Sequence, residues 1–285
     1  MAHAQSDRHG HDVILTGLPR SGTTLTCHLL NKLADTVALH EPMDVVALGR
    51  TAGAAAACDE VARFLADTRH SLLTTGTAVS KHAAGQVPAN SVGDKQADAQ
   101  RKSIVARGSI EIDKPLSPGF LLCIKHPSAF TALLDGLRGR FRCYGIVRNP
   151  LAVLASWNSV QMPVGQGHIP AAEDLDAGLK AALAGIPDVA GRQLHLLDWF
   201  FSKYQPLQAQ GAVIRYEEVI ASGGRVLQAV TPAAAELGEP LTEKNANKQY
   251  DREAMRVLGR RLLESEGAWW DFYSREDVER LLERY

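Results

Sequence analysis

The residues best suited to chemistry stand near the start of the chain, in the sequence Gly17-Leu-Pro-Arg-Ser-Gly-Thr-Thr24. They lie between a short apolar run, residues 13 to 17, and an apolar-periodic stretch of about residues 22 to 33 that predicts a helix. A glycine-bearing turn between a buried strand and a helix offers backbone N–H groups and the positive helix end to an anion. We therefore predict a phosphate site made by Ser21, Gly22, Thr23 and Thr24.

This loop differs from the ATP-binding pattern GxxxxGK[ST] at one position. Both glycines and Thr24 are in place, but Thr23 stands where a lysine would reach the β- and γ-phosphates. Arg20 still supplies a cation, from a different point of the loop. The pattern favours an anionic donor other than ATP with magnesium. The alternative is a plain glycine turn followed by a Ser or Thr helix cap.

A second group of ionisable residues ends the next predicted strand. Residues 36 to 39 read as a short strand, followed by His40, Glu41 and Pro42, and the proline turns the chain. Because ligands of open α/β sheets gather at the C-terminal ends of strands, Glu41 should lie beside the phosphate loop. The competing interpretation is a carboxylate that only caps the turn before Pro42.

Two later strands also end in basic residues. Lys125 and His126 follow the continuous apolar run of residues 120 to 124. Successive residues of a strand point to opposite faces, so these two side chains should not enter one site. Arg148 ends the strand predicted at residues 142 to 147, and Ser156 lies two turns into the next helix. These two can meet at one phosphate only where the chain folds back.

The elements that must position these residues alternate along the chain. Short apolar strands separated by helices predict an α/β fold, a central parallel β-sheet flanked by helices on both faces. We expect a single domain over residues 1–285, with a helical and mobile excursion on the substrate side at about 43–118. Within it, residues 53 to 78 follow a helical pattern, and residues 83 to 118 are polar, contain glycine and show little periodicity.

Composition narrows the classes of function. The chain has 285 residues with 31 basic and 32 acidic side chains, so no global field would draw it to nucleic acid or an acidic membrane. No apolar run reaches membrane-spanning length, and no secretory signal is visible, which predicts a cytoplasmic location. The cysteines lack metal-ligand spacing and are expected to be buried free thiols; they are Cys27, Cys58, Cys123 and Cys143.

Two of these segments together resemble a known family. The sequence GLPRSGTT resembles the 5′-phosphosulfate loop of sulfotransferases that use 3′-phosphoadenosine 5′-phosphosulfate (PAPS), in the arginine-containing form of Golgi and bacterial members. The segment 146–156 resembles the family's 3′-phosphate segment, in which a strand ends in arginine and serine follows eight residues later. The resemblance implies the P-loop-containing nucleoside triphosphate hydrolase-like sulfotransferase fold, PAPS as co-substrate, its product PAP, and no metal.

Weaker resemblances and departures complete this comparison. Residues 122–127 resemble the family's strand-end lysine segment, and 215–218 resemble its RYED segment near the adenine, which makes Tyr216 a candidate nucleotide ligand. Many members have tryptophan where Leu25 stands, so the adenine needs another contact here. Trp199 falls where the family has an aromatic-rich helix, although a core role is the expected reading. Glu217 and Glu218 are expected to begin a solvated helix face.

The resemblance and the strand ends together imply roles. Glu41 is the predicted general base, with His40 as its rival and His126 behind it, because in-line transfer needs a group that takes the acceptor's proton. Arg20 would neutralise the departing 5′-phosphate oxygen, and Lys125 would bind the sulfuryl oxygens.

The predicted function is a sulfotransferase acting on a hydroxyl or amine of a small polar metabolite or carbohydrate. One alternative is a P-loop kinase of a small metabolite, which the absent lysine and the absent Walker B aspartate oppose. The other is a nucleotide-binding regulatory module without catalysis.

Overall fold

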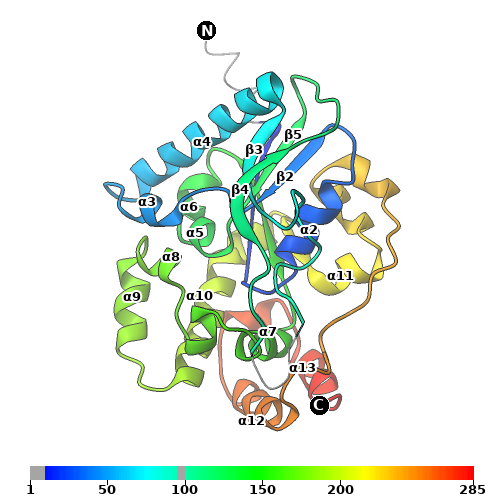
Figure 1. Ribbon diagram of the computed structural model, residues 1–285. Coiled ribbons are helices and arrows are strands. Elements are labelled where there is room, and N and C mark those ends of the chain that lie inside the picture. The colour runs from blue at the N-terminus through cyan, green and yellow to red at the C-terminus, as the bar shows by residue number, and fades with distance from the viewer. Residues whose placement is uncertain (1–9, 95–99) are drawn as a thin grey trace.

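The computed structural model describes residues 10–94 and 100–285 of the chain (Figure 1). Five parallel strands form its central sheet in the order β2-β5-β1-β6-β7. Their bounds are β1 Asp12–Gly17, β2 Thr36–His40, β5 Leu121–Lys125, β6 Arg142–Val147 and β7 Val213–Arg215. The strands β1, β2, β5 and β6 lie where the sequence predicts strands, and the α/β class with its parallel sheet is confirmed.

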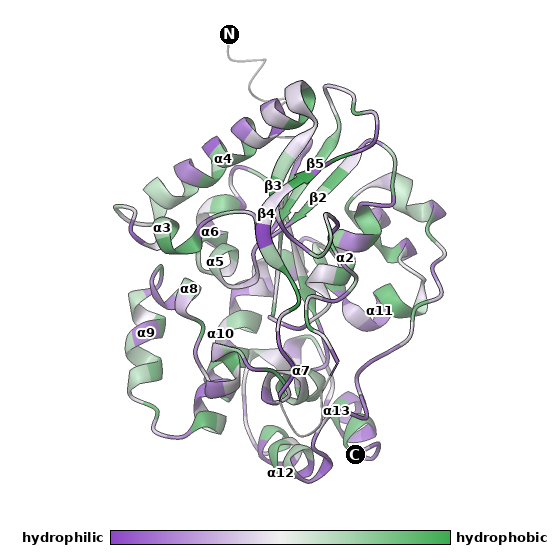
Figure 2. Cartoon of the chain, viewed as in Figure 1, coloured by the Kyte–Doolittle hydropathy of each residue, from purple (hydrophilic) through white to green (hydrophobic). Residues whose placement is uncertain are grey.

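The strands are apolar on both sides because helices cover both faces of the sheet. Along β1, Ile14 packs into one hydrophobic cluster, while its neighbours Val13 and Leu15 pack into another on the opposite face. The second cluster includes residues of α2, Thr23–Leu30, and α11, Tyr216–Ala221. Figure 2 shows the strands β2 and β5 in strongly hydrophobic colours, as two-sided burial requires.

The further helices α5 to α10, α12 and α13 each contribute buried residues to the first cluster. Their bounds are α5 Pro127–Ala132, α6 Leu134–Leu137, α7 Pro150–Asn158, α8 Pro170–Glu173, α9 Ala177–Ala184, α10 Val189–Ala209, α12 Arg252–Leu263 and α13 Arg275–Leu282. Four short 3-10 turns are η1 Pro163–Gln166, η2 Arg225–Ala229, η3 Pro232–Glu236 and η4 Ala268–Asp271. Trp199 on α10 packs at the edge of this cluster and against the ring of Phe200, as a core role requires.

The excursion after β2 contains more order than the sequence indicates. Its helical part is confirmed as α3, Val45–Gly49, and α4, Ala54–Thr75. The expectation of a mobile stretch at 83–118 is wrong for β4, Ala106–Glu111, which pairs antiparallel with β3, Thr77–His82. Only Ile110 of β4 is buried, so the strand lacks an apolar signature and is formed by pairing. Lys95, Gln96 and Asp98, which belong to this polar stretch, lie outside the described residues.

Three further expectations concern properties of the whole chain. All four cysteines are free and buried, as expected. In the described part of the chain, no group of three or more His, Cys, Asp or Glu side chains could hold a metal ion. None of the helices in the described ranges combines the length and the apolar character that a membrane span needs.

Candidate active site at the C-terminal edge of the sheet

The predicted phosphate loop, residues 17–24, begins at the end of the central strand β1 and continues into the start of α2. Two of its glycines are required by space: a Cβ on Gly17 would come 2.4 Å from the carbonyl oxygen of Ile146, and one on Gly22 would come 2.7 Å from the ring of Tyr216. Gly22 also has a φ of 94°, and Arg20 adopts a φ of 71° although it is not glycine. A non-glycine residue in this region costs about 1 to 3 kcal/mol and concentrates at functional sites.

Contacts from two other elements hold the loop in place. The indole Nε1 of Trp157 donates to the carbonyl of Pro19 at 2.8 Å, and Arg148 donates to the carbonyl of Arg20 at 2.9 Å. The hydroxyl of Ser21 donates to the carbonyl of Ile146 at 2.8 Å, and its N–H donates to Leu18. Both the hydroxyl and the N–H of Ser21, which was predicted as a phosphate ligand, therefore donate to carbonyl groups of the protein.

A cavity of about 640 Å³ opens above the loop. Thr23 and Thr24 line it at the start of α2, together with Gly22. Glu41 and Lys125, from the ends of β2 and β5, line the same cavity. The structure therefore brings the two predicted groups to one edge of the sheet, because β5 lies between β2 and β1.

Glu41 is held between two ammonium groups. Its Oε1 lies 2.8 Å from Nζ of Lys125, which is 2% exposed, and its Oε2 lies 2.5 Å from Nζ of Lys81 on β3. Burial alone would raise the pKa of Glu41, but Lys125 and Lys81 bring this pKa well below its usual value. The backbone of Glu41 is left-handed, with a φ of 46°. A carboxylate so placed is ionised and fixed in position.

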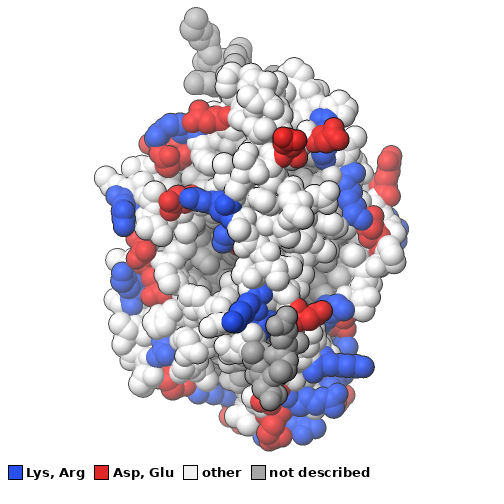
Figure 3. All heavy atoms as spheres, in the orientation of Figure 1, with Lys and Arg blue, Asp and Glu red and all other residues white. Residues whose placement is uncertain are grey.

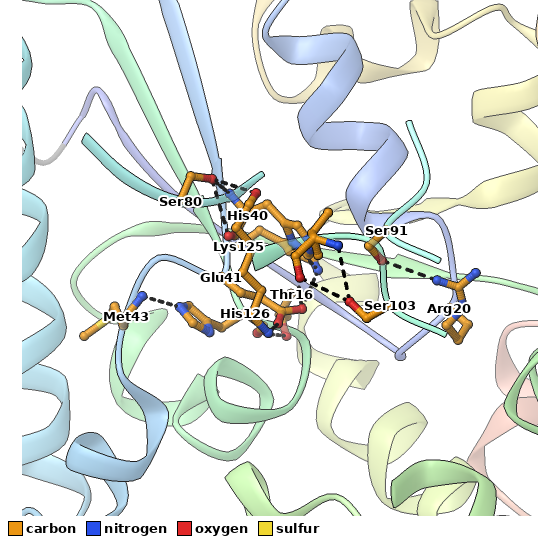
Figure 4. Close-up of polar contacts among 12 residues, drawn as sticks. Thr16, Arg20, His40, Glu41, Met43, Ser80, Ser91, Ser103, Lys125 and His126 are labelled. Carbon is orange, nitrogen blue, oxygen red and sulfur yellow. Dashed lines mark hydrogen bonds and ion pairs between the residues drawn. The ribbon is translucent and has the colours of Figure 1, made fainter. Parts of the chain in front are cut away.

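The two histidines next to this pair are neutral. Burial, followed by the charge of Lys125, lowers the pKa of His40 to about 2, and the His40 Nδ1 lies 3.0 Å from Nζ of Lys125. Burial lowers the pKa of His126 to about 3, and its Nε2 accepts a hydrogen bond from the N–H of Met43 at 3.0 Å. Both rings therefore have an acceptor nitrogen occupied by the protein. Figure 4 shows His126 turned toward Met43 and His40 beside Lys125.

Lys125 and His126 face different spaces, as their alternation predicts. Lys125 lines the main cavity, whereas His126 lines a smaller cavity of about 210 Å³. Glu41 borders both. The carboxylate therefore stands at the boundary between two spaces.

Three arginines gather on the other side of the loop. The Nε of Arg20 donates to Ser156 at 3.3 Å, and its Nη2 donates to Asn90 at 3.1 Å. Burial and the nearby Arg101 lower the pKa of Arg20 to about 10. Arg101 is 5% exposed and lines the main cavity, and its Nε has no hydrogen-bond partner in the described residues. In Figure 4, a dashed line joins Arg20 to Ser91, apart from the group around Glu41 and Lys125.

Arg148 uses its donors differently from the prediction. Its Nε donates to Asn245 Oδ1 and its Nη2 donates to the carbonyl of Lys244, both at 2.7 Å. Its guanidinium also lies 4.6 Å from the ring centre of Tyr216. With the bond to Arg20, three of its donors point at protein acceptors. Arg148 thus ties the phosphate loop to the segment 242–250, although it also lines the cavity.

The hydroxyl of Tyr250 contacts both Arg148 and Ser156, the two residues that were predicted to meet at a phosphate. Burial by itself would raise the pKa of Tyr250, but the charge of Arg148 and hydrogen bonds with Ser156 and Arg148 bring it below its usual value. Ser156 is fully buried between Arg20 and this phenol. Arg148 and Ser156 therefore converge, but on a side chain of the protein itself.

Residues near the predicted adenine position line the same cavity. Tyr216, Leu25 and Ile220 form its wall, and the hydroxyl of Tyr216 accepts a hydrogen bond from the N–H of Lys244 at 3.1 Å. Glu217 does not belong to a solvated face: it accepts from Asn149 N, Asn245 Nδ2 and the hydroxyl of Tyr273. It thereby orients Asn245, the partner of Arg148.

Sequence reasoning missed three contributors to the site. They are Lys81, Arg101 and the segment 242–250 with Tyr250. Lys81 and Arg101 belong to the excursion, where no strand pattern or motif singles out one basic residue among several. The segment 242–250 lies outside any helix or strand, so only its folding against Arg148 shows its place.

Comparison with known proteins gives little help. No protein-family model and no curated protein matches this chain. Among solved structures it is similar to the sulfotransferase STF1 from Mycobacterium tuberculosis H37Rv, with 14% sequence identity over 98% of this chain and 78% of that chain, and a TM-score of 0.36.

Proposed function

We propose that this chain is a PAPS-dependent sulfotransferase that moves a sulfuryl group to a hydroxyl or amine of a small acceptor. One observation supports this most strongly. A phosphate loop without the Walker lysine shares a single cavity with Glu41 and Lys125, a carboxylate and an ammonium group 2.8 Å apart. An anionic donor, a proton acceptor and a cation for the transferred group are what this transfer needs.

The donor would lie across the cavity with its two ends at different clusters. Its 5′-phosphosulfate binds over Thr23 and Thr24 at the start of α2, where the helix end favours an anion. Its adenine lies against Tyr216 and Leu25, in place of the tryptophan that many cytosolic sulfotransferases carry.

The arginine cluster would take the 3′-phosphate. Arg20 and Arg101 bind it where the Tyr250 hydroxyl now lies. Among the described residues Arg20 has neutral hydrogen-bond partners and the Nε of Arg101 has none, so their charges remain for a ligand. This replaces the expected role of Arg20 at the departing phosphate, since its guanidinium faces Ser156. Arg148 holds the loop and adds its charge to the cluster.

The chemical step uses the residues at the other end. The acceptor oxygen or nitrogen attacks sulfur as the bond from sulfur to the 5′-phosphate oxygen breaks, and the electron pair leaves with PAP. Glu41 takes the acceptor's proton, while Lys125 binds the sulfuryl oxygens. When Lys125 turns to the sulfuryl group, Glu41 loses its closest buried counter-charge, so its proton affinity rises during transfer.

Calorimetry with PAP and with ATP tests the proposal. PAP should bind with a Kd of about micromolar order in the presence of EDTA, because the loop lacks the lysine that ATP needs. ATP should bind much more weakly, with or without magnesium. Tight binding of ATP that depends on magnesium would instead indicate a P-loop kinase.

A further inference from the structure

The smaller cavity beside Glu41 leads away from the donor. It is lined by Glu41, Met43, Lys81, Arg107 and His126, among others, and Glu41 is the one lining residue that it shares with the main cavity in the described part of the chain. Met43 and Arg107 also line a larger hollow of about 720 Å³. The two spaces share Met43, Asp44 and Arg107 and therefore adjoin, and we treat them as one path to the carboxylate of Glu41. Figure 3 shows charged side chains of both signs meeting over β4, next to a hollow in the surface.

The β3–β4 hairpin supplies one wall of this path. In its register Lys81 lies opposite Arg107, and Val79 lies opposite Ser109. Alternate residues such as Ser80 and Ile110 are buried beneath the hairpin, so the first four share its outer face. Two cations directly opposite each other destabilise a strand pair. Such an arrangement needs a compensating anion.

The two cations are compensated unequally. Lys81 has its counter-charge in Glu41 at 2.5 Å. Arg107 is 3.7 Å from Asp44, and the other oxygen of that carboxylate accepts from Val46 N and Ala47 N at the start of α3. Within the described residues the guanidinium of Arg107 makes no hydrogen bond. Its planar fork of donors is therefore open to a ligand.

The surroundings of Arg107 are apolar on one side. Val79 is a large aliphatic side chain that is 41% exposed, and it lines the hollow together with Met43, Leu48 and Phe64. A ligand that reaches Glu41 along this path passes both an apolar wall and a guanidinium that, within the described residues, has an ion pair with Asp44 at 3.7 Å and no hydrogen bond.

We infer that this path binds the acceptor, and that the acceptor is a small molecule carrying a carboxylate that Arg107 holds. Its short apolar body lies against Val79 and Met43, and its hydroxyl or amine reaches Glu41. The inference rests on the proposed function and narrows its acceptor from a general small polar molecule to an anionic, partly apolar one. Arg107 determines specificity and does not touch the reacting atoms.

Binding of a matched pair of compounds to the PAP complex tests this inference. The probes are 4-hydroxyphenylacetate and 4-hydroxyphenylacetamide, which have nearly the same shape and differ in charge. Calorimetry on the full chain saturated with PAP should give at least about tenfold tighter binding of the carboxylate, since a bidentate charge-assisted contact is lost in the amide. In Arg107→Gln the ratio of the two affinities should fall to about one. Arg107→Lys should retain part of the preference.

Arg256→Gln on α12 is the matched control, because Arg256 is also an exposed arginine and does not line the main cavity, the smaller cavity or the hollow beside it. It should keep the preference, and its loss there would show a general charge effect and overturn the inference. The inference also fails if PAP binds but the two probes bind equally, or if neither binds. If PAP itself does not bind, the proposed function fails first. Unfolding temperatures of all variants establish that they are folded.

Discussion

The two charged clusters of the main cavity use their cations in opposite ways. At the loop, Arg20 donates to serine and asparagine side chains, and the Nε of Arg101 has no hydrogen-bond partner in the described part of the chain. At the strand ends, Lys81 and Lys125 both contact the carboxylate of Glu41. Cations with neutral partners keep their charge for an incoming anion, whereas ammonium groups around a carboxylate keep that carboxylate ionised and in place. We call Arg20 and Arg101 the binding cluster. We call Glu41 with Lys81 and Lys125 the reactive cluster.

Both clusters share one backbone feature. Arg20 and Glu41 each have a positive φ, 71° and 46°, although neither is glycine. Arg20 lies within the loop and Glu41 directly follows β2, and each positive φ costs about 1 to 3 kcal/mol for a non-glycine residue. The surrounding contacts must offset this cost, which agrees with the dense hydrogen bonding around both residues.

The largest expected effect breaks the reactive cluster. Glu41→Gln keeps the shape of the side chain but cannot take the acceptor's proton, so turnover should fall by at least about a hundredfold. The affinity for PAP should stay within about twofold, since the arginine cluster is untouched. Steady-state kinetics with an accepted substrate, or slow PAPS hydrolysis, measures turnover, and calorimetry measures affinity.

Substitution of the neighbouring histidines provides the control. His40→Asn and His126→Asn should cost far less turnover, because both rings are neutral and their acceptor nitrogens are occupied. A histidine variant that abolishes turnover while Glu41→Gln remains active would identify that histidine as the base. Glu41 would then be a capping residue.

The second expected effect is a loss of folding stability in acid, caused by His126 next to the reactive cluster. The pKa of His126 is about 3 in the folded chain and about 6.5 when unfolded, so below pH 6.5 only the unfolded state takes up this proton. The stability that the neutral ring contributes is full above pH 6.5 and is lost as the pH falls toward 3. At pH 5 the loss is about 2 kcal/mol from His126.

Denaturant unfolding at pH 7 and pH 5 measures this loss. His126→Gln, whose amide oxygen can still accept from Met43, should reduce the difference between the two pH values by about 2 kcal/mol. His40 has a pKa of about 2 and should leave a similar share in the variant. The same pH dependence in both proteins would mean that His126 is not buried in neutral form.

The third effect breaks the binding cluster. Arg101→Gln should weaken binding of PAP by about 2 kcal/mol, or roughly thirtyfold, because a charge-assisted contact to the 3′-phosphate is lost. Adenosine 5′-phosphate, which lacks that group, should bind almost as before. Calorimetry with both nucleotides measures the difference. Equal losses would contradict a role for Arg101 at the 3′-phosphate.

Two further variants sharpen this result. Arg148→Ala should weaken both nucleotides, because Arg148 fixes the loop through the carbonyl of Arg20. Tyr250→Phe removes the hydroxyl from the arginine cluster and should tighten PAP by about threefold, the scale of a single hydrogen bond. Weaker PAP binding to Tyr250→Phe would mean that the phenol itself contacts the nucleotide.

The sequence predicts the sheet and one half of the site because these depend on local patterns. Apolar runs locate β1, β2, β5 and β6, and strand ends place Glu41 and Lys125 together without any knowledge of distant contacts. Burial of the cysteines also agrees with the apolar runs in which three of them lie.

The remainder depends on partners far away in the chain. Arg148 was expected to face a phosphate, but Lys244 and Asn245 take up its donors, and nothing near residue 148 indicates this. Lys81 becomes a partner of Glu41 only through the β3–β4 hairpin, whose second strand has a single buried residue. The sequence around Glu217 is typical of a solvated helix start. Its carboxylate gains the hydrogen bond from Tyr273 only when that distant residue packs against it.

The central place of β1 also sets the order in which the chain can fold. Its strand partners, β5 and β6, both begin beyond residue 120, so β1 stays unpaired until the middle of the chain is available. Closing so long a loop costs entropy before any contact repays it, and parallel pairings of this kind form slowly. Gly17 meets Ile146 across the register of β1 and β6, so the phosphate loop takes its shape only when β6 docks. Under the proposed function, nucleotide binding therefore reports on the completed sheet and not on the N-terminal segment that carries the loop.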